Sequence, residues 1–168
     1  VRTYGNYLQV EWNPIEKLTL LGGSRYDYVD IKGYYLFNGV NKDSNKQISK
    51  FVPRLTAMYN LSETMKLRGS FAQGYRAPQA FDEELHTEVL DGNPIFVELD
   101  RNLTSETSNS FTASLNYTKR EGNTQANLIL EGFYTRINDR FIDQDLTDIG
   151  NIKHKLKTNA KDQLAIIG

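Results

Sequence analysis

Residues 110–118 read SFTASLNYT, and the spacing of apolar residues in this stretch decides the fold class. The apolar residues are Phe111, Ala113, Leu115 and Tyr117, and small polar residues stand between them. Successive side chains of a β-strand point to opposite faces, so a period of two predicts a strand with one apolar and one polar face.

The same alternation recurs in five further segments, at about residues 7–13, 18–28, 54–60, 66–72 and 125–135. Ile129 and Phe133 interrupt the polar face of the last segment. No stretch approaches the roughly 18 consecutive apolar residues of a transmembrane helix. We therefore expect an all-β chain of about six antiparallel strands. Four charged residues are expected on the polar faces: Arg25, Arg54, Arg68 and Glu131.

The connections between these segments alternate between short and long. Short turns are expected near residues 14, 62 and 122, and long polar loops near 31–50 and 77–104. An up-and-down transmembrane β-barrel has tight turns on one side of the membrane and long loops on the other. The sequence therefore predicts such a barrel, with the two long loops outside.

Aromatic residues gather at both ends of the expected strands. Trp12, Tyr59 and Tyr117 stand near the short turns, and Tyr26 and Tyr134 near the loop ends. Amphipathic rings favour the two membrane interfaces, where one side is apolar and the other is wet. Their placement is a second, independent indication of a membrane-spanning sheet.

Residues 144–168 show no amphipathic strand and are expected to form a tail of uncertain structure. Its end, residues 165–168, has no obvious pairing partner. About six strands over residues 1–143 do not close a barrel, and an open sheet in a bilayer would expose unpaired backbone groups at two edges. We therefore expect the chain to be an incomplete fragment of a larger barrel.

Three blocks of sequence resemble the second half of the TonB-dependent receptors. These are residues 51–55 (FVPRL), 67–78 (LRGSFAQGYRAP) and 102–107 (NLTSET), and their order and spacing both match. The resemblance runs from about residue 4 to about residue 143, and the block that ends in YRAP is its most specific part.

Membership of this family would imply a barrel of roughly 22 strands with a plug domain inside it, in the outer membrane of a Gram-negative bacterium. It would also imply active uptake of a scarce, bulky ligand such as a siderophore, haem or cobalamin. The expected partners are the rest of the barrel, its plug, outer-membrane lipid and the TonB energy-coupling complex, which would act through parts outside this chain.

The second long loop carries the candidate binding residues. Its carboxylates and its Asp-Gly-Asn turn suit a hard cation such as calcium, although the ligand spacing of an EF-hand is absent and a solvated acidic loop is the alternative. The candidate metal ligands are Asp82, Glu83, Glu84, His86 and Asp91.

His86 lies between the YRAP and NLTSET blocks, a layout that resembles the haem receptors of the family, in which a loop histidine can ligate iron. An ordinary loop histidine is the alternative. No cofactor is certain, and haem is a candidate transported ligand. The ligand-side candidates are Tyr75, Arg76, His86, Asp91 and Asn93.

Several other functions are not expected. The chain has no cysteine, no basic run and a formal net charge of −1, so nothing indicates a thiolate site or a nucleic-acid partner. Its two histidines, His86 and His154, form no catalytic motif, so we expect no enzyme. The remaining alternative is a soluble all-β binding module, possibly one that binds carbohydrate, whose apolar face would be buried against a second sheet.

Overall fold

The computed structural model describes residues 2–37, 40–78, 95–147 and 153–168. All regular secondary structure in these ranges is β-strand, which confirms the predicted all-β class. The strands are β1 (Arg2–Ile15), β2 (Leu18–Phe37), β3 (Val40–Asn60), β4 (Met65–Arg76), β5 (Ile95–Leu99), β6 (Glu106–Glu121), β7 (Thr124–Asn138), β8 (Phe141–Asp145), β9 (Lys153–Asn159) and β10 (Leu164–Ile167). Within the described ranges, no helix is long and apolar enough to cross a membrane.

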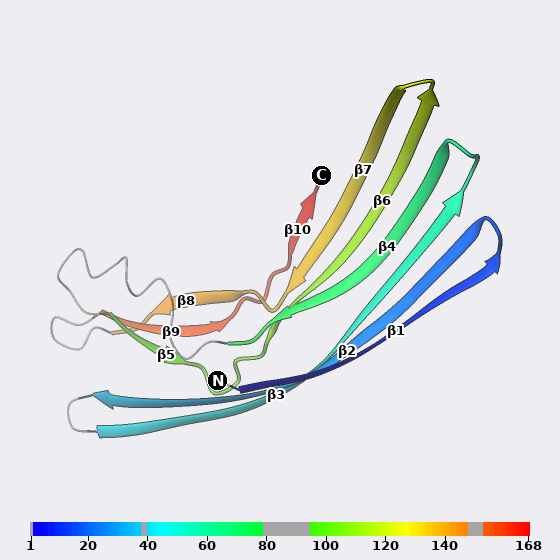
Figure 1. The fold of residues 1–168 in the computed structure, drawn as a ribbon. Coiled ribbons are helices and arrows are strands. Elements are labelled where there is room, and N and C mark those ends of the chain that lie inside the picture. Colours follow the sequence, from blue (N-terminus) through cyan, green and yellow to red (C-terminus); the bar gives the residue numbers. More distant parts are fainter. Residues whose placement is uncertain (1, 38–39, 79–94, 148–152) are drawn as a thin grey trace.

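Seven strands form one sheet in the order β1-β2-β3-β4-β6-β7-β10, and every neighbouring pair in it is antiparallel. This confirms the expected antiparallel up-and-down arrangement. Figure 1 shows the long strands side by side in one curved, open sheet. The other three strands form a small sheet, β5-β9-β8, in which the β5–β9 pair is parallel.

The three short turns all lie at the same end of the large sheet (Figure 1). They are formed by residues 16–17, 61–64 and 122–123. The first turn comes after Pro14, which stays inside β1 at an irregularity in the register between Trp12 and Ile15. Proline cannot donate to a ladder and is tolerated at such irregularities, so it is a poor marker of this turn.

The expected loop over residues 31–50 is largely strand. The β2–β3 ladder continues without a break from the Leu18–Tyr59 pair to the Phe37–Val40 pair. The sequence predicts a loop for this segment because many of its residues are polar and it shows no sustained period of two. A hairpin does not need such a period along its whole length, because its ladder is formed by backbone groups.

The tail also differs from expectation, because it contains β9 and β10. β10 pairs with β7, from Leu164 opposite Ile137 to Ile167 opposite Tyr134, so the end of the chain does have a partner. The four residues of β10 are too few to show a period of two. Its partner is β7, and two other strands, β8 and β9, lie between them in the chain. Neither fact can be read from the local sequence.

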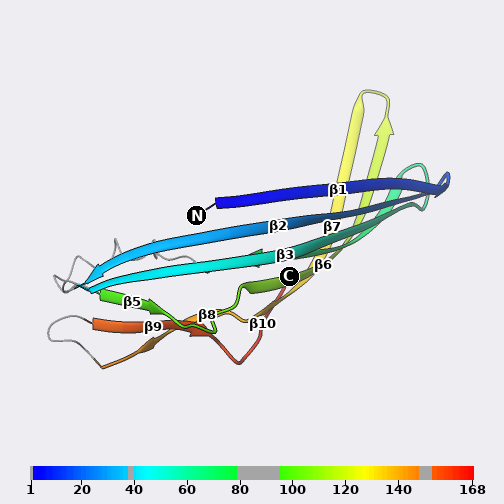
Figure 2. The same ribbon diagram turned by 90° about the horizontal axis from the view of Figure 1, so that it is seen from below.

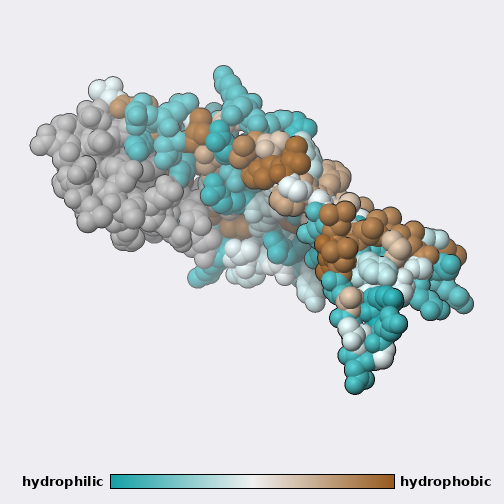
Figure 3. All heavy atoms as spheres, turned by 90° about the horizontal axis from the view of Figure 1, so that it is seen from above, coloured by the Kyte–Doolittle hydropathy of each residue, from teal (hydrophilic) through white to brown (hydrophobic). Residues whose placement is uncertain are grey.

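In the length of the sheet that is expected to face the membrane, the register places most apolar residues on one face, with exceptions such as Leu21 and Phe133. One row crosses the whole sheet: Val10, Gly22, Leu55, Phe71, Phe111, Tyr134 and Ile167. Many of these side chains are exposed, including Leu55 at 58% and Leu128, on the same face, at 67%. Figure 3 shows apolar side chains gathered over the middle of the strands, with hydrophilic ones toward the hairpin tips. No second sheet of described residues covers this face.

The buried core is small and lies at the end of the sheet away from the short turns. Val29, Ile31 and Ile48 form it, and the partly buried Tyr75 and Ala77 pack against them. Leu103, at 1% exposure, is also buried at this end. The chain therefore buries its side chains where the sheet extends beyond the apolar row, and leaves the apolar face itself uncovered.

We expect Gly122→Ala to destabilise the β6–β7 hairpin. Gly122 has a φ of +58°, and an added Cβ would meet no atom within 4 Å, so the penalty is purely conformational. Left-handed backbone costs a residue with a Cβ about 1–2 kcal/mol. The matched control is Gly69→Ala, where an added Cβ also meets nothing within 4 Å but φ is not positive. Urea unfolding of the two variants in detergent micelles should separate them, and equal midpoints would show that the backbone at Gly122 is not what limits this turn.

Candidate functional site

Most of the predicted ligand-side residues lie outside the described residues. These are Asp82, Glu83, Glu84, His86, Asp91 and Asn93. The calcium site and the haem-ligating histidine therefore stay predictions. Within the described ranges, no group of three or more His, Cys, Asp or Glu side chains could hold a metal ion.

Tyr75 lies near the end of β4 and contacts a buried carboxylate. Its hydroxyl donates to Asp27 Oδ2 at 2.9 Å, and Arg25 Nε donates to the same oxygen at 2.8 Å. Asp27 is only 3% exposed, and a buried carboxylate is costly unless charged or polar donors satisfy it. Two strands that are not neighbours, β2 and β4, are thus joined through one oxygen atom.

Gly5 of β1 makes room for this carboxylate. It stands directly opposite Asp27 in the β1–β2 ladder. A Cβ added to Gly5 would lie 2.7 Å from Asp27 Oδ1, closer than real Cβ contacts allow. A glycine at this position lets the Asp27 side chain lie flat over β1.

Arg76, the next residue of β4, points to a different partner. Its guanidinium lies 3.1 Å from Glu106 Oε2 and 4.9 Å from the centre of the Phe141 ring. The same Glu106 oxygen accepts the Phe141 backbone N–H at 3.2 Å. Arg76 therefore helps to attach the start of β8 to the ends of β4 and β6. The structure places Tyr75 and Arg76 in two separate clusters.

The turn that leads into β6 is held by side chains from β9. Asp100 accepts the Asn102 backbone N–H at 2.9 Å and the Thr158 hydroxyl at 3.1 Å. These hydrogen bonds, that from the Asn102 backbone first, lower the pKa of Asp100 from its usual value. Asn159 accepts the Thr104 N–H at 2.8 Å and donates to the Asp139 carbonyl at 2.6 Å. β9 thus links the β6 entry to the β7–β8 connection.

The charged residues expected on the polar faces share one face of the large sheet. Arg68 is opposite Ser114, which is opposite Glu131, so the three form one row across β4, β6 and β7. Arg54 lies on the same face, opposite Ala72. Arg54, Arg68 and Glu131 are all exposed. Arg25 belongs to this face too, but its side chain is engaged by Asp27.

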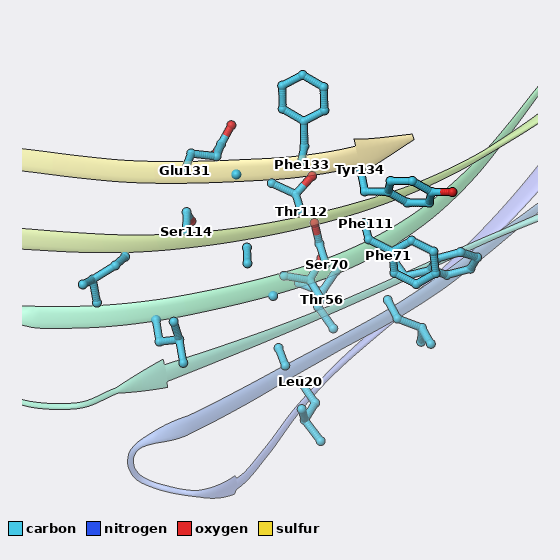
Figure 4. A pocket seen from close by; sticks show the side chains of 18 of the residues that line it. Leu20, Thr56, Ser70, Phe71, Phe111, Thr112, Ser114, Glu131, Phe133 and Tyr134 are labelled. Carbon is cyan, nitrogen blue, oxygen red and sulfur yellow. The ribbon is translucent and has the colours of Figure 1, made fainter. Parts of the chain in front are cut away.

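One hollow of about 1330 Å³ extends across the middle of the large sheet. Most of its lining residues, such as Trp12, Leu55 and Leu115, belong to the apolar face. Figure 4 shows Phe71, Phe111 and Tyr134 grouped together, and the first two rings lie 4.9 Å apart. A ligand pocket needs convergent polar groups to orient its occupant, and this face lacks them. The hollow is therefore a feature of the apolar surface, separate from the clusters at the far end.

Sequence reasoning missed several residues of these clusters, namely Asp27, Asp100, Glu106 and Asn159. Only Asp27 had a local signal, because Arg25 and Asp27 are two residues apart and so share a face of a strand. Glu106 and Asn159 bind partners at least 20 residues away in the chain, and Asp100 is joined to Thr158 across 58 residues. Such pairings depend on tertiary structure.

The comparisons with known proteins agree with this architecture. The family model "TonB dependent receptor-like, beta-barrel" matches residues 1–163. No curated protein matches the sequence. The solved structures that share the fold include a double mutant of the Serratia marcescens haemophore receptor HasR in complex with its haemophore HasA and haem, the copper transporter OprC, and the FrpB iron transporter from Neisseria meningitidis (F5-1 variant).

The likeness to these structures covers nearly all of this chain and less than a third of theirs. HasR has a TM-score of 0.73 at 14% identity, over 99% of this chain and 30% of its own. OprC has a TM-score of 0.66 at 18% identity and FrpB 0.65 at 18%, each over 99% of this chain, but 24% and 22% of their own chains. The chain therefore spans less than a third of the length of these proteins.

We expect the turn at residues 100–104 to loosen at low pH. Because folding lowers the pKa of Asp100, its carboxylate stabilises the turn above the usual value of 3.8, and this contribution is lost as the pH falls through the lower pKa of the folded state. Hydrogen exchange of the Asn102 and Leu103 amides, corrected for its intrinsic pH dependence, should report the loss.

Asp100→Asn is the control for this prediction. The amide side chain keeps an oxygen acceptor and does not titrate, so its turn should be looser at neutral pH and should lose little more protection on acidification. If both proteins lost protection equally below pH 3.8, Asp100 would not be the group responsible.

Proposed function

The chain belongs to the β-barrel domain of the TonB-dependent receptor family, and from this we propose that it forms part of the wall and outer mouth of an outer-membrane receptor that takes up a metal-containing ligand. Its place would be the outer membrane of a Gram-negative bacterium. The family consists of receptors and transporters, and no enzymatic activity is proposed.

The observation that carries the proposal is the uncovered apolar face. Val10, Leu55, Leu128 and Leu130 are between 58% and 71% exposed on one continuous surface of the sheet. Exposed apolar patches of this extent mark contact with a partner or a membrane. Outer-membrane barrels carry an outward apolar band of this kind and a polar interior.

The polar face would then line the inside of the barrel. Arg54, Arg68 and Glu131 are exposed there, where a plug domain and water would surround them. β1 and β10 are the edges of the described sheet, and an edge in lipid leaves backbone groups unpaired at a cost of several kcal/mol each. Further strands of the barrel are the natural partners of both edges.

The proposed ligand is iron- or copper-bearing, such as haem, a ferric siderophore or a metal complex of similar size. The support is that the solved structures with this fold include a haemophore receptor with haem, an iron transporter and a copper transporter. Ligand capture is proposed at the end with the long connections, and energy coupling through parts of the receptor outside this chain.

The soluble binding module is less well supported. It requires the apolar face to be buried against a second sheet. In the described structure the second sheet, β5-β9-β8, adjoins the loop end, and Leu55 and Leu128 stay exposed.

We expect Leu128→Arg to impair assembly of the full-length receptor, and Asn127→Arg to be tolerated. Leu128 is 67% exposed on the apolar face, while its neighbour Asn127 points to the polar face, where Thr118 donates to its side chain at 3.1 Å. An arginine on the lipid face costs about 2–4 kcal/mol at the middle of the bilayer and less toward the interface expected at Tyr117, which stands opposite Leu128; an arginine in the lumen stays hydrated. Heat-modifiable migration of outer-membrane fractions measures assembly, and equal behaviour of the two variants would defeat the assignment of faces.

We expect deletion of residues 83–94 to abolish uptake and to leave the barrel assembled. The probes are growth on haem as sole iron source and accumulation of radiolabelled ferric siderophores and of copper. Asn123→Ala, in a short turn at the opposite end, is the control and should transport normally. Undiminished uptake would remove this loop from the binding site. His86→Ala tests the haem hypothesis separately, because a variant that still uses haem would rule out His86 as a required ligand.

A further inference from the structure

The large sheet divides in two beyond the row that contains Arg54 and Ala72. The β3–β4 ladder ends at that pair, whereas the β2–β3 ladder continues to Phe37 and Val40 and the β4–β6 ladder continues to Arg76 and Glu106. We call residues 25–37 and 40–52, with residues 2–7 of β1 that pair with them, the hairpin branch, and residues 73–78 with 103–109 the β4–β6 branch. Both views show the β2–β3 hairpin facing the β5-β9-β8 sheet across this division (Figures 1 and 2).

The contact between Tyr75 and Asp27 reveals how the branches are arranged. Tyr75 is on the same side of β4 as Phe71, which belongs to the apolar face. Asp27 is on the side of β2 opposite to Tyr26, which places it on the polar face. In a continuous sheet these two side chains would point in opposite directions. They meet because the β4–β6 branch passes over the polar face of the hairpin branch.

Side-chain contacts connect the two branches where the structure describes their side chains. The Tyr75 hydroxyl donates to Asp27, and Tyr75 and Ala77 cover Val29, Ile31 and Ile48. In addition, the Lys46 ammonium donates to the Leu103 carbonyl. No backbone ladder joins the described parts of the branches above the Arg54–Ala72 pair, so they can separate without breaking any strand pairing. A local opening that leaves every backbone ladder intact costs less free energy than one that unpairs strands.

We propose that the hairpin branch is a hinged flap at the loop end of the wall, and that the Tyr75–Asp27 hydrogen bond is the clasp that keeps it closed. The hinge is the point where β3 and β4 separate, at Arg54 and Ala72. Opening would expose Val29, Ile31 and Ile48 and would widen the mouth of the barrel on this side. The gating role rests on the proposed function, because it requires this end of the sheet to face the outside. The flap and its clasp do not depend on which end of the sheet faces the outside.

The test measures exposure of the surface beneath the flap in the full-length receptor, in outer membranes and without ligand. This chain contains no cysteine, so Ile48→Cys, in a receptor with any other cysteines replaced, gives one reporter thiol. Ile48 is 8% exposed and should react slowly with a maleimide. Adding Tyr75→Phe keeps the ring that packs on the core and removes only the hydroxyl. Because a hydrogen bond to a charged group is lost, labelling should become about tenfold faster.

Three comparisons make the result specific. Gln47→Cys, on the neighbouring exposed residue, should label rapidly and equally in both backgrounds. Tyr26→Phe, on the apolar face of β2, should leave labelling of Ile48→Cys unchanged. Gly5→Ala should accelerate it, because the new methyl group would displace the Asp27 carboxylate from another strand.

Heat-modifiable migration identifies which variants are assembled. An assembled Tyr75→Phe receptor with an unchanged labelling rate would overturn the clasp. If the Tyr75→Phe receptor failed to assemble, an unchanged labelling rate of Ile48→Cys in the assembled Gly5→Ala receptor would overturn the clasp. The measurement needs no substrate, so a failure of the uptake assays would leave its result intact.

Discussion

The register of the antiparallel ladders is the constraint on which the rest of this structure depends. A strand that slipped by one residue would turn every side chain to the opposite face. The register aligns the row from Val10 to Ile167 on one face across seven strands. It aligns Arg68, Ser114 and Glu131 on the other face. The two-residue turn at Gly122 fixes one of these registers, because its φ of +58° suits a tight hairpin.

A sheet sorted in this way cannot bury its apolar face by itself. In a soluble protein that face would need a second layer, and the described chain builds its only substantial core elsewhere. The hollow over the middle of the sheet follows from the same geometry, because small residues such as Gly22, Gly69 and Ala113 lie between the larger ones on that face. A surface of this kind is suited to hydrocarbon, which fills irregular spaces without any need for polar partners.

At the end of the sheet beyond the apolar rows, polar side-chain contacts take the place of the continuous apolar surface. There the structure satisfies charges individually: Asp27 by Arg25 and Tyr75, Glu106 by Arg76, and Asp100 by Thr158. The Tyr75–Asp27 and Thr158–Asp100 contacts join parts of the chain that the main ladder does not hold together. The Arg25–Asp27 pair lies within β2, and the Arg76–Glu106 pair joins neighbouring strands. The loop end is therefore organised by a few polar side chains, which leaves it more adaptable than the paired sheet below it.

The sequence by itself determined the fold class, the six long strands and the two faces of the sheet, because a period of two is a local property of neighbouring residues. It also carried the family resemblance, through the blocks at 51–55, 67–78 and 102–107. The seventh strand, the continuation of β2 and β3 through residues 31–50, and the small parallel pair of β5 and β9 could not be read in this way. Only the tertiary structure decided these features, and only it brought Tyr75 to Asp27, 48 residues earlier in the chain. Strand alternation assigns those two residues to opposite faces, and the crossing of the two branches depends on where each ladder ends, which is set by partners distant in sequence.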